Sequence, residues 1–146
     1  MSLPLETTII TRGVVRLLYH RGMDVAVEID LPNGRRADVM GIDRLGGIVI
    51  IETKVTLIDL LRDEKWPEYR AYCDAFFIAV PPDFQMQHVP QGVGVIVADR
   101  FGGEVILEAP LHKIAAATRK VVLVDFARTA ARRLCRALDA GFDELP

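Results

Sequence analysis

Residues 36–54 read RADVMGIDRLGGIVIIETK and predict a β-hairpin. The pair Gly46-Gly47 supplies the positive φ angles that a tight reversal of the chain needs. The apolar run at 48–51 is typical of a buried central strand, and it stops abruptly at Glu52. We expect the rest of the chain to pack around this hairpin.

Three polar side chains are expected at one end of the hairpin. Residues two apart in a strand share a face, so Glu52 and Lys54 point the same way, and close pairing of the strands places Asp38 beside them. Two carboxylates can hold Mg²⁺, which polarises a phosphoryl oxygen and lowers the pKa of a bound water. The lysine can position that water or offset charge on the phosphate. A plain ion pair at the strand end is the open alternative, because the D…ExK pattern is short.

The composition fits one globular domain, and the charge is unevenly distributed. The 146 residues carry a net charge of −2, which does not indicate a nucleic-acid binder by itself. From His112 to Arg136, however, there are seven basic residues and one acidic residue, Asp125. A basic stretch on an acidic body fits a groove that binds phosphate, and a solvated helix face is the alternative.

Cysteine content and hydropathy exclude several classes of protein. Cys73 and Cys135 are the two cysteines, and no CxxC motif occurs, which argues against a disulfide scaffold or a zinc ribbon and fits a reducing cytosol. No N-terminal signal segment and no apolar run of membrane-spanning length is found. We therefore expect a cytoplasmic protein with no membrane contact.

The other elements follow from periodicity and turn signals. In strand 25–31, Val25, Val27 and Ile29 are expected to share one face. Thr56 is a plausible N-cap for a helix ending at Arg62 or Asp63. Further helices are expected at 5–21 and 67–73, with a break near Lys65-Trp66, and further strands at 75–80, 93–98 and 104–108. This order predicts an α/β fold with a mixed central β-sheet flanked by helices.

Residues 112–139 are predicted to form one long amphipathic C-terminal helix, although the β-branched run 121–124 leaves a strand open. Arg128, Arg132 and Arg136 share one face of this helix and are candidates for phosphate contact. The expected packing seam consists of Ile114, Ala117, Val121, Val124, Ala131, Leu134 and Leu138.

Several stretches of the chain resemble a known family. The order helix, strand, Asp-bearing strand, ExK-bearing strand, helix resembles the PD-(D/E)XK nuclease superfamily, whose fold is restriction-endonuclease-like. Over nearly its whole length the chain resembles, more closely, the MmcB-like family of bacterial DNA-repair proteins. The matching stretches are GRRAD at 34–38, ETK at 52–54, DEKWPEY at 63–69, YCD at 72–74, FIAVP at 77–81, GVGVIVAD at 92–99 and the Ala-Arg-rich end.

The resemblance implies a single PD-(D/E)XK nuclease-like domain over residues 1–146 and a set of site residues. Asp38 and Glu52 correspond to ligands of Mg²⁺ (or Mn²⁺), the Thr53 carbonyl to a third ligand, and Lys54 to the catalytic lysine. Glu28 is a candidate for the acidic residue that some members contribute from an earlier element. The chain departs from the pattern at Ala37, where the proline before the aspartate would stand.

The resemblance also implies DNA as a partner. Lys65 and Tyr69 resemble a Gln-x-x-x-Tyr pair of some nuclease branches, and the lysine favours phosphate contact; for Trp66 and Tyr69, core packing is the alternative. The full set of candidate DNA contacts is Arg35, Arg36, Lys65, Tyr69, Arg128, Arg132 and Arg136.

The expected function is hydrolysis of DNA phosphodiester bonds in DNA repair, with other repair or translesion-synthesis proteins as candidate partners. The first alternative is a catalytically silent DNA-binding or adaptor module of the same fold. The second is a structural protein whose carboxylates are paired with arginines.

Overall fold

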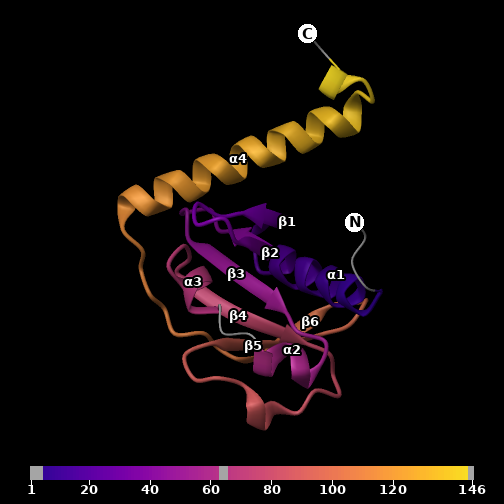
Figure 1. Ribbon diagram of the computed structural model, residues 1–146, viewed down its shortest axis with the longest axis vertical. Coiled ribbons are helices and arrows are strands. Elements are labelled where there is room, and N and C mark those ends of the chain that lie inside the picture. The colour runs from indigo at the N-terminus through magenta and orange to yellow at the C-terminus, as the bar shows by residue number, and fades with distance from the viewer. Residues whose placement is uncertain (1–4, 63–65, 145–146) are drawn as a thin grey trace.

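The computed structural model describes residues 5–62 and 66–144 (Figure 1). The helices are α1 Leu5–His20, α2 Leu57–Arg62, α3 Trp66–Arg70 and α4 Ala116–Leu138, with short 3-10 helices η1 Met86–His88 and η2 Phe142–Glu144. The strands are β1 Asp24–Asp30, β2 Arg36–Ile42, β3 Ile48–Thr53, β4 Ala75–Val80, β5 Gly94–Ala98 and β6 Gly103–Leu107.

The six strands form one mixed sheet in the order β1-β2-β3-β4-β5-β6. Strands β1, β2 and β3 pair antiparallel, β3, β4 and β5 pair parallel, and β6 returns antiparallel to β5. A parallel pair needs a crossover, and α2 and α3 provide it between β3 and β4. The expected α/β fold, with a mixed sheet flanked by helices and a long C-terminal helix, is confirmed.

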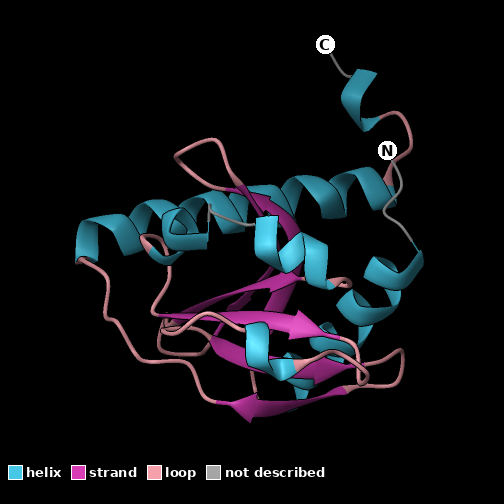
Figure 2. Cartoon of the chain, turned by 60° about the horizontal axis from the view of Figure 1, so that its bottom comes forward, coloured by secondary structure: helices cyan, strands magenta, loops and turns pink. Residues whose placement is uncertain are grey.

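Helices cover both faces of the sheet. On one face, Ile10, Val14 and Leu18 of α1 pack in a buried cluster with the strands. The other face carries a second cluster, to which α2, α3 and α4 contribute Leu60, Trp66, Tyr69, Val122 and Phe126. In Figure 2, α4 runs across the top of the view with the strands beneath it. None of the helices in the described residues is long and apolar enough to cross a membrane.

The β2–β3 connection is a five-residue loop, and it differs from the expected turn. Gly46 has a φ of 85°, whereas Gly47 is not among the glycines with positive φ. Gly47 is needed for a different reason. The Asp43 carboxylate accepts hydrogen bonds from the N–H groups of Leu45 and Gly47, both at 2.8 Å, and a Cβ on Gly47 would collide with it. The prediction that both glycines supply positive φ angles is therefore wrong.

Strand β1 changes face at Glu28, which was not foreseen. Val25 and Val27 pack in the cluster beneath α1, whereas Ile29 packs in the cluster on the opposite face. The cause is the backbone of Glu28, whose φ of 51° lies in the left-handed region and interrupts the alternation of an extended strand. The prediction of one shared face for Val25, Val27 and Ile29 is wrong.

The packing face of α4 also differs from the expected seam. The helix begins at Ala116 and contacts the body through Val122, Leu123 and Phe126. Members of the predicted seam lie on the outside: Val121 is 48% exposed and Leu138 is 79% exposed. The predicted helix is confirmed, but a heptad count could not say which apolar stripe the sheet would cover.

The two helices after β3 agree with expectation where the structure describes them. The Thr56 hydroxyl accepts a hydrogen bond from the N–H of Asp59 at 3.1 Å, so Thr56 caps α2 as predicted. Helix α3 begins at Trp66, one residue before Pro67, and ends at Arg70, three residues before the predicted end at Cys73. The expected break near Lys65 lies outside the described residues.

Asp74 connects three segments at the start of β4. Its carboxylate forms a two-pronged ion pair with the Arg119 guanidinium, at 2.6 and 2.7 Å, and accepts from the N–H groups of Ile48 and Ile114. Burial raises the pKa of Asp74, but the Arg119 guanidinium and the two N–H donors outweigh it and lower that pKa to about 2. This contact fixes α4 to the amino ends of β3 and β4.

We predict that Arg119→Ala lowers the free energy of unfolding by about 3 kcal/mol, because it leaves a mostly buried carboxylate without its cation. Lys120 is the exposed neighbour, and Lys120→Ala should change stability by no more than about 0.5 kcal/mol. Urea unfolding of both variants measures the difference. Equal midpoints would contradict the importance given to this ion pair.

The same contact predicts a pH dependence. The folded-state pKa of Asp74 lies below its ordinary value of 3.8, so its contribution is present above that pH and is lost as pH falls toward 2. The Arg119→Ala protein should lose less stability than the wild type over this window.

Candidate active site

Asp38 and Glu52 face each other where the β2–β3 ladder ends. Regular pairing runs from Ile42–Ile48 to Val39–Ile51, and the next opposed pair is Asp38 and Glu52. At this pair, hydrogen bonds to the two carboxylates take the place of the backbone hydrogen bonds of the ladder. The Asp38 N–H donates to Glu52 Oε1 at 3.1 Å, and the Thr53 N–H donates to Asp38 Oδ2 at 2.9 Å. The reciprocal contacts hold both carboxylates together at the end of a buried strand.

Two negative charges at the Asp38–Glu52 pair would be unfavourable, because Glu52 is buried and the carboxylates are adjacent. Glu52 is only 5% exposed. Burial raises the pKa of Glu52, the adjacent Asp38 raises it further to about 10, and the Lys54 ammonium opposes the shift. Two carboxylates in such a position need a proton or a cation between them. The pair is therefore suited to a positively charged ligand.

Lys54 is held next to this pair by the sheet. It directly follows β3, and its N–H donates to the carbonyl of Ala79 at 2.8 Å, which extends the β3–β4 pairing by one residue. The side chain is half-buried, and its charge acts on Glu52. The structure thus brings together Asp38, Glu52 and Lys54, as the sequence predicted, while their roles stay predictions.

Glu28 lies on the neighbouring strand but does not join the pair. The β1–β2 register places it directly opposite Asp38. Its left-handed backbone costs about 1–2 kcal/mol for a residue with a Cβ. Two hydrogen bonds from the guanidinium of Arg133 on α4, to the carbonyls of Val27 and Glu28, stabilise it. Among the described residues, no three His, Cys, Asp or Glu side chains gather closely enough to hold a metal ion.

The donors present nevertheless fit Mg²⁺ or Mn²⁺. These ions prefer oxygen ligands, and Mg²⁺ commonly binds one or two carboxylates while keeping several waters. Asp38 and Glu52 supply two carboxylates, and a divalent cation would offset the unfavourable charge that raises the pKa of Glu52. The Thr53 carbonyl stays a predicted third ligand. Its N–H is bound to Asp38, and in the described part of the chain its buried hydroxyl has no hydrogen-bond partner.

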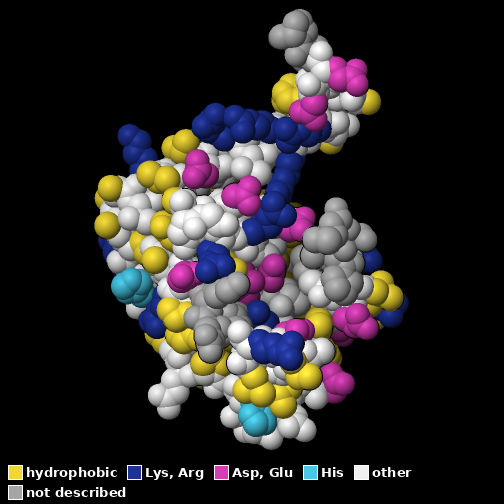
Figure 3. Space-filling view, viewed as in Figure 1, with side chains coloured by type: hydrophobic (Ala, Val, Ile, Leu, Met, Phe, Trp, Pro, Cys, Tyr) yellow, Lys and Arg dark blue, Asp and Glu magenta, His cyan; other side chains and the backbone are white. Residues whose placement is uncertain are grey.

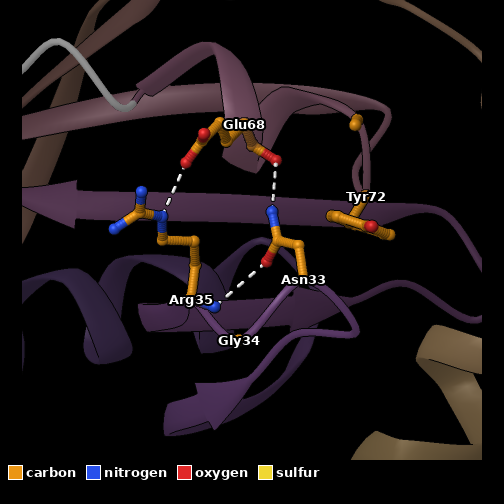
Figure 4. Close-up of a pocket in the computed structure, with 6 residues that line it drawn as sticks. Asn33, Gly34, Arg35, Glu68 and Tyr72 are labelled. Atoms are coloured by element: carbon orange, nitrogen blue, oxygen red, sulfur yellow. Dashed lines mark hydrogen bonds and ion pairs between the residues drawn. The ribbon is translucent and has the colours of Figure 1, made fainter.

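The arginines of the β1–β2 turn contact acidic side chains. Arg35 pairs with Glu68 of α3 at 2.6 Å, and Asn33 donates to the Glu68 carbonyl, so the turn is attached to α3 around a cavity of about 350 Å³ (Figure 4). Arg36 pairs with Asp30 at 3.1 Å. The hydrogen bond to Asp30 raises the pKa of Arg36, and the charge of Glu28 adds to this. A phosphate would have to compete with these carboxylates.

The arginines of α4 divide between two sides of the helix. Arg128 and Arg132 are exposed, and Figure 3 shows a band of Lys and Arg side chains over part of α4. Arg136 pairs with Asp143 at 2.9 Å. Arg133 turns inward to β1. Of the three predicted phosphate contacts on α4, Arg128 and Arg132 thus present their side chains to solvent most openly.

Comparison with known proteins places the chain in a family. A family model described as "DNA repair protein MmcB-like" matches residues 3–141. The chain belongs to the MmcB-like family of DNA-repair proteins. Membership in the MmcB-like family indicates a role in DNA repair and an interaction with DNA.

A solved structure supports the fold of this MmcB-like chain. The SPO1766 protein of unknown function from Silicibacter pomeroyi is 36% identical, with a TM-score of 0.90, over 96% of this chain and 95% of that one. Comparison with curated proteins gave no match.

Two of the candidate DNA contacts of this MmcB-like chain, Tyr69 and Lys65, need separate discussion. The ring of Tyr69 stacks on Phe76, with centroids 6.0 Å apart, and Trp66 stacks on the same ring. Both side chains pack against the core, which was the alternative interpretation. Lys65 lies outside the described residues, so its contact with phosphate stays a prediction.

Sequence reasoning missed Arg133. It was grouped with the basic segment, but it stands one residue off the i, i+4, i+8 row of Arg128, Arg132 and Arg136. That offset puts it about 100° around the helix from Arg132, on the side that meets β1. The offset was visible in the sequence, whereas the left-handed Glu28 backbone that it contacts was not.

Proposed function

We propose that this MmcB-like protein is a metal-dependent nuclease of the PD-(D/E)XK type that hydrolyses phosphodiester bonds of DNA during repair. The observation that carries the proposal is the reciprocal Asp38–Glu52 contact beside Lys54, at the end of a buried strand. A buried carboxylate pair needs a proton or a cation to neutralise it, and groups with such raised pKa values cluster at functional sites. In this proposal residues 1–146 act as one nuclease-like domain in the cytoplasm.

Each residue of the site has a role in the proposed reaction. Asp38, Glu52 and the Thr53 carbonyl hold Mg²⁺ or Mn²⁺, which when bound polarises a phosphoryl oxygen and acidifies a water. Lys54 orients the attacking water or neutralises charge that develops on the phosphate. The reciprocal backbone contacts fix both carboxylates before substrate arrives, so little ordering remains to be done in the transition state.

DNA is bound, in this proposal, by cationic side chains around the site. Arg128 and Arg132 on α4 contact backbone phosphates directly, and Arg136 does so when it leaves Asp143. Arg35 and Arg36 add contacts nearer the Asp38–Glu52 pair, where phosphate replaces their carboxylate partners. Lys65 is a further candidate contact. Other repair or translesion-synthesis proteins are candidate partners of the complex.

The DNA-binding part predicts a salt dependence. The logarithm of the binding constant should fall with the logarithm of salt concentration, with a slope of roughly −0.9 per contacted phosphate on duplex DNA. Replacing both Arg128 and Arg132 by alanine should make the slope shallower by about two units. The control is Arg100, in the turn between β5 and β6, which lie at the opposite end of the strand order from β1. Arg100→Ala should leave the slope unchanged. If the double variant has the wild-type slope, this face of α4 is a solvated surface that makes no phosphate contacts.

The second candidate function is a catalytically silent DNA-binding or adaptor module. It is favoured by the absence, among the described residues, of a third carboxylate, His or Cys side chain close to the pair. Asp38→Asn separates the two functions. A nuclease should lose metal-dependent cleavage and keep its DNA affinity, whereas an adaptor should behave like the wild type in both assays.

A further inference from the structure

The starting observation is the backbone of Glu28. Among the described residues, Glu28 is the non-glycine residue with a positive φ, and it lies within a strand rather than at a turn. On either side of it, Val27 pairs with Val39 and Ile29 pairs with Ala37. The left-handed conformation is therefore local to one residue, and that residue is an acid opposite the candidate site.

Arg133 holds this conformation from outside the sheet. Its two terminal nitrogens donate to two consecutive carbonyls, those of Val27 and Glu28, the latter at 2.6 Å. Successive carbonyls of an extended strand point to opposite sides, so both can meet one guanidinium only because Glu28 is rotated. The planar fork of arginine suits such a pair of acceptors, because each carbonyl meets its own nitrogen, whereas lysine has a single nitrogen.

An extended backbone at Glu28 would have a different result. The Asp38 N–H points to β3, where Glu52 accepts from it, so Glu28 and Asp38 form a pair without mutual backbone hydrogen bonds. In such a pair, side chains share a face with Cβ atoms about 4.5–5.5 Å apart. The Glu28 carboxylate would then lie beside Asp38. In the observed conformation no three acidic side chains of the described residues gather closely enough to hold a metal ion, so Glu28 stands apart from the Asp38–Glu52 pair, and its charge acts on Arg36.

We propose that Arg133 is a positioning residue that keeps the Glu28 carboxylate away from the Asp38–Glu52 pair. Release of the Arg133 contact lets the Val27–Glu28 peptide rotate while Ile29 keeps its place in the core cluster, and this brings a third carboxylate to the cation site. This inference rests on the proposed function, since it concerns the same cation site. It makes α4 a part of the site, because the helix that presents Arg132 to solvent also carries Arg133.

The test measures Mn²⁺ affinity directly, by calorimetric titration of the full-length protein, so that it does not depend on cleavage. Arg133→Ala should bind Mn²⁺ more tightly than the wild type, by a factor within the roughly 5- to 150-fold range typical of coupled sites. Glu28→Gln alone should leave the affinity unchanged, because the carboxylate is held away. The double variant should return to the wild-type value, which completes a double-mutant cycle.

The test includes a control variant and a second substitution of Arg133. Lys120→Ala removes another exposed charge of α4, one outside the proposed DNA contacts, and should have no effect. Arg133→Lys keeps the charge but offers one donor nitrogen in place of the two that contact the carbonyls, so it should also tighten binding and serves if the alanine variant does not fold. A purely structural role for Arg133 would give the opposite sign, because a loosened site binds more weakly.

The possible outcomes distinguish a failure of this inference from a failure of the proposed function. Mn²⁺ binding by the wild type that depends on Asp38 and is unchanged or weaker in both Arg133 variants overturns the inference alone. A gain in affinity that persists in the double variant overturns it as well. No Mn²⁺ binding by any of the proteins overturns both the cation site and the inference.

Discussion

The Lys54→Ala protein is expected to cleave DNA about 10²–10³-fold more slowly than the wild type, by analogy with the loss of one oxyanion-hole donor. Its affinity for DNA should stay nearly normal. Lys54 is fixed at the end of β3 by the bond from its N–H to Ala79, and its charge reaches Glu52. A charge in that position acts on the attacking water or the reacting phosphate, so its removal should affect the chemical step more than the binding of substrate.

The measurement combines affinity in Ca²⁺, to limit turnover, with cleavage in Mg²⁺ or Mn²⁺. Lys120 is the matched control, an exposed lysine on α4. Lys120→Ala should leave both the DNA affinity and the rate at saturating DNA nearly unchanged, because Lys120 is not one of the proposed contacts. If Lys54→Ala instead weakens binding and leaves that rate intact, Lys54 is one more phosphate contact and its catalytic role is wrong.

The Glu52→Gln protein is expected to lose the stabilisation that Mn²⁺ gives to the wild type. A ligand at a hundredfold excess over its Kd stabilises the folded state by about 2.7 kcal/mol, provided that it does not bind the unfolded chain. Glutamine keeps an oxygen that can accept from the Asp38 N–H but removes the charge that a cation needs. Without metal the variant should be at least as stable as the wild type at neutral pH, because burial and Asp38 already favour the uncharged form of Glu52.

Thermal unfolding with and without Mn²⁺ measures the effect. Glu104 on β6 is an exposed acid, and Glu104→Gln should keep the full metal-induced shift. Equal shifts in wild type and Glu52→Gln would place the ion elsewhere on the protein.

Most of the fold could be predicted because its signals are local. The apolar runs that form β3 and β4, the turn glycines and the Thr56 cap each determine a few adjacent residues. The meeting of Asp38 and Glu52 was also predictable, since a short connection between two antiparallel strands sets their register. Helix α4 was predictable as a helix, but its packing face was set by where the β1 edge of the sheet lies.

The remaining features of the site depend on contacts between distant residues. The left-handed backbone of Glu28 is held by Arg133, which is 105 residues away in sequence, and no local pattern indicates it. Likewise, the pairing of Asp74 with Arg119 joins residues 45 apart. Their residue types were visible, but their partners were not. The face change of β1 goes with this left-handed residue, which is why the strand pattern misplaced Ile29.

The central claim is that the Asp38–Glu52 pair with Lys54 is a metal-dependent nuclease site. The most direct measurement is cleavage by the purified wild-type protein of single-stranded, nicked, branched and damaged DNA, in Mg²⁺ or Mn²⁺ and in EDTA. The account predicts cleavage of at least one of these substrates that requires the metal. DNA binding without cleavage of any substrate, with either metal, would contradict it and favour the DNA-binding or adaptor module.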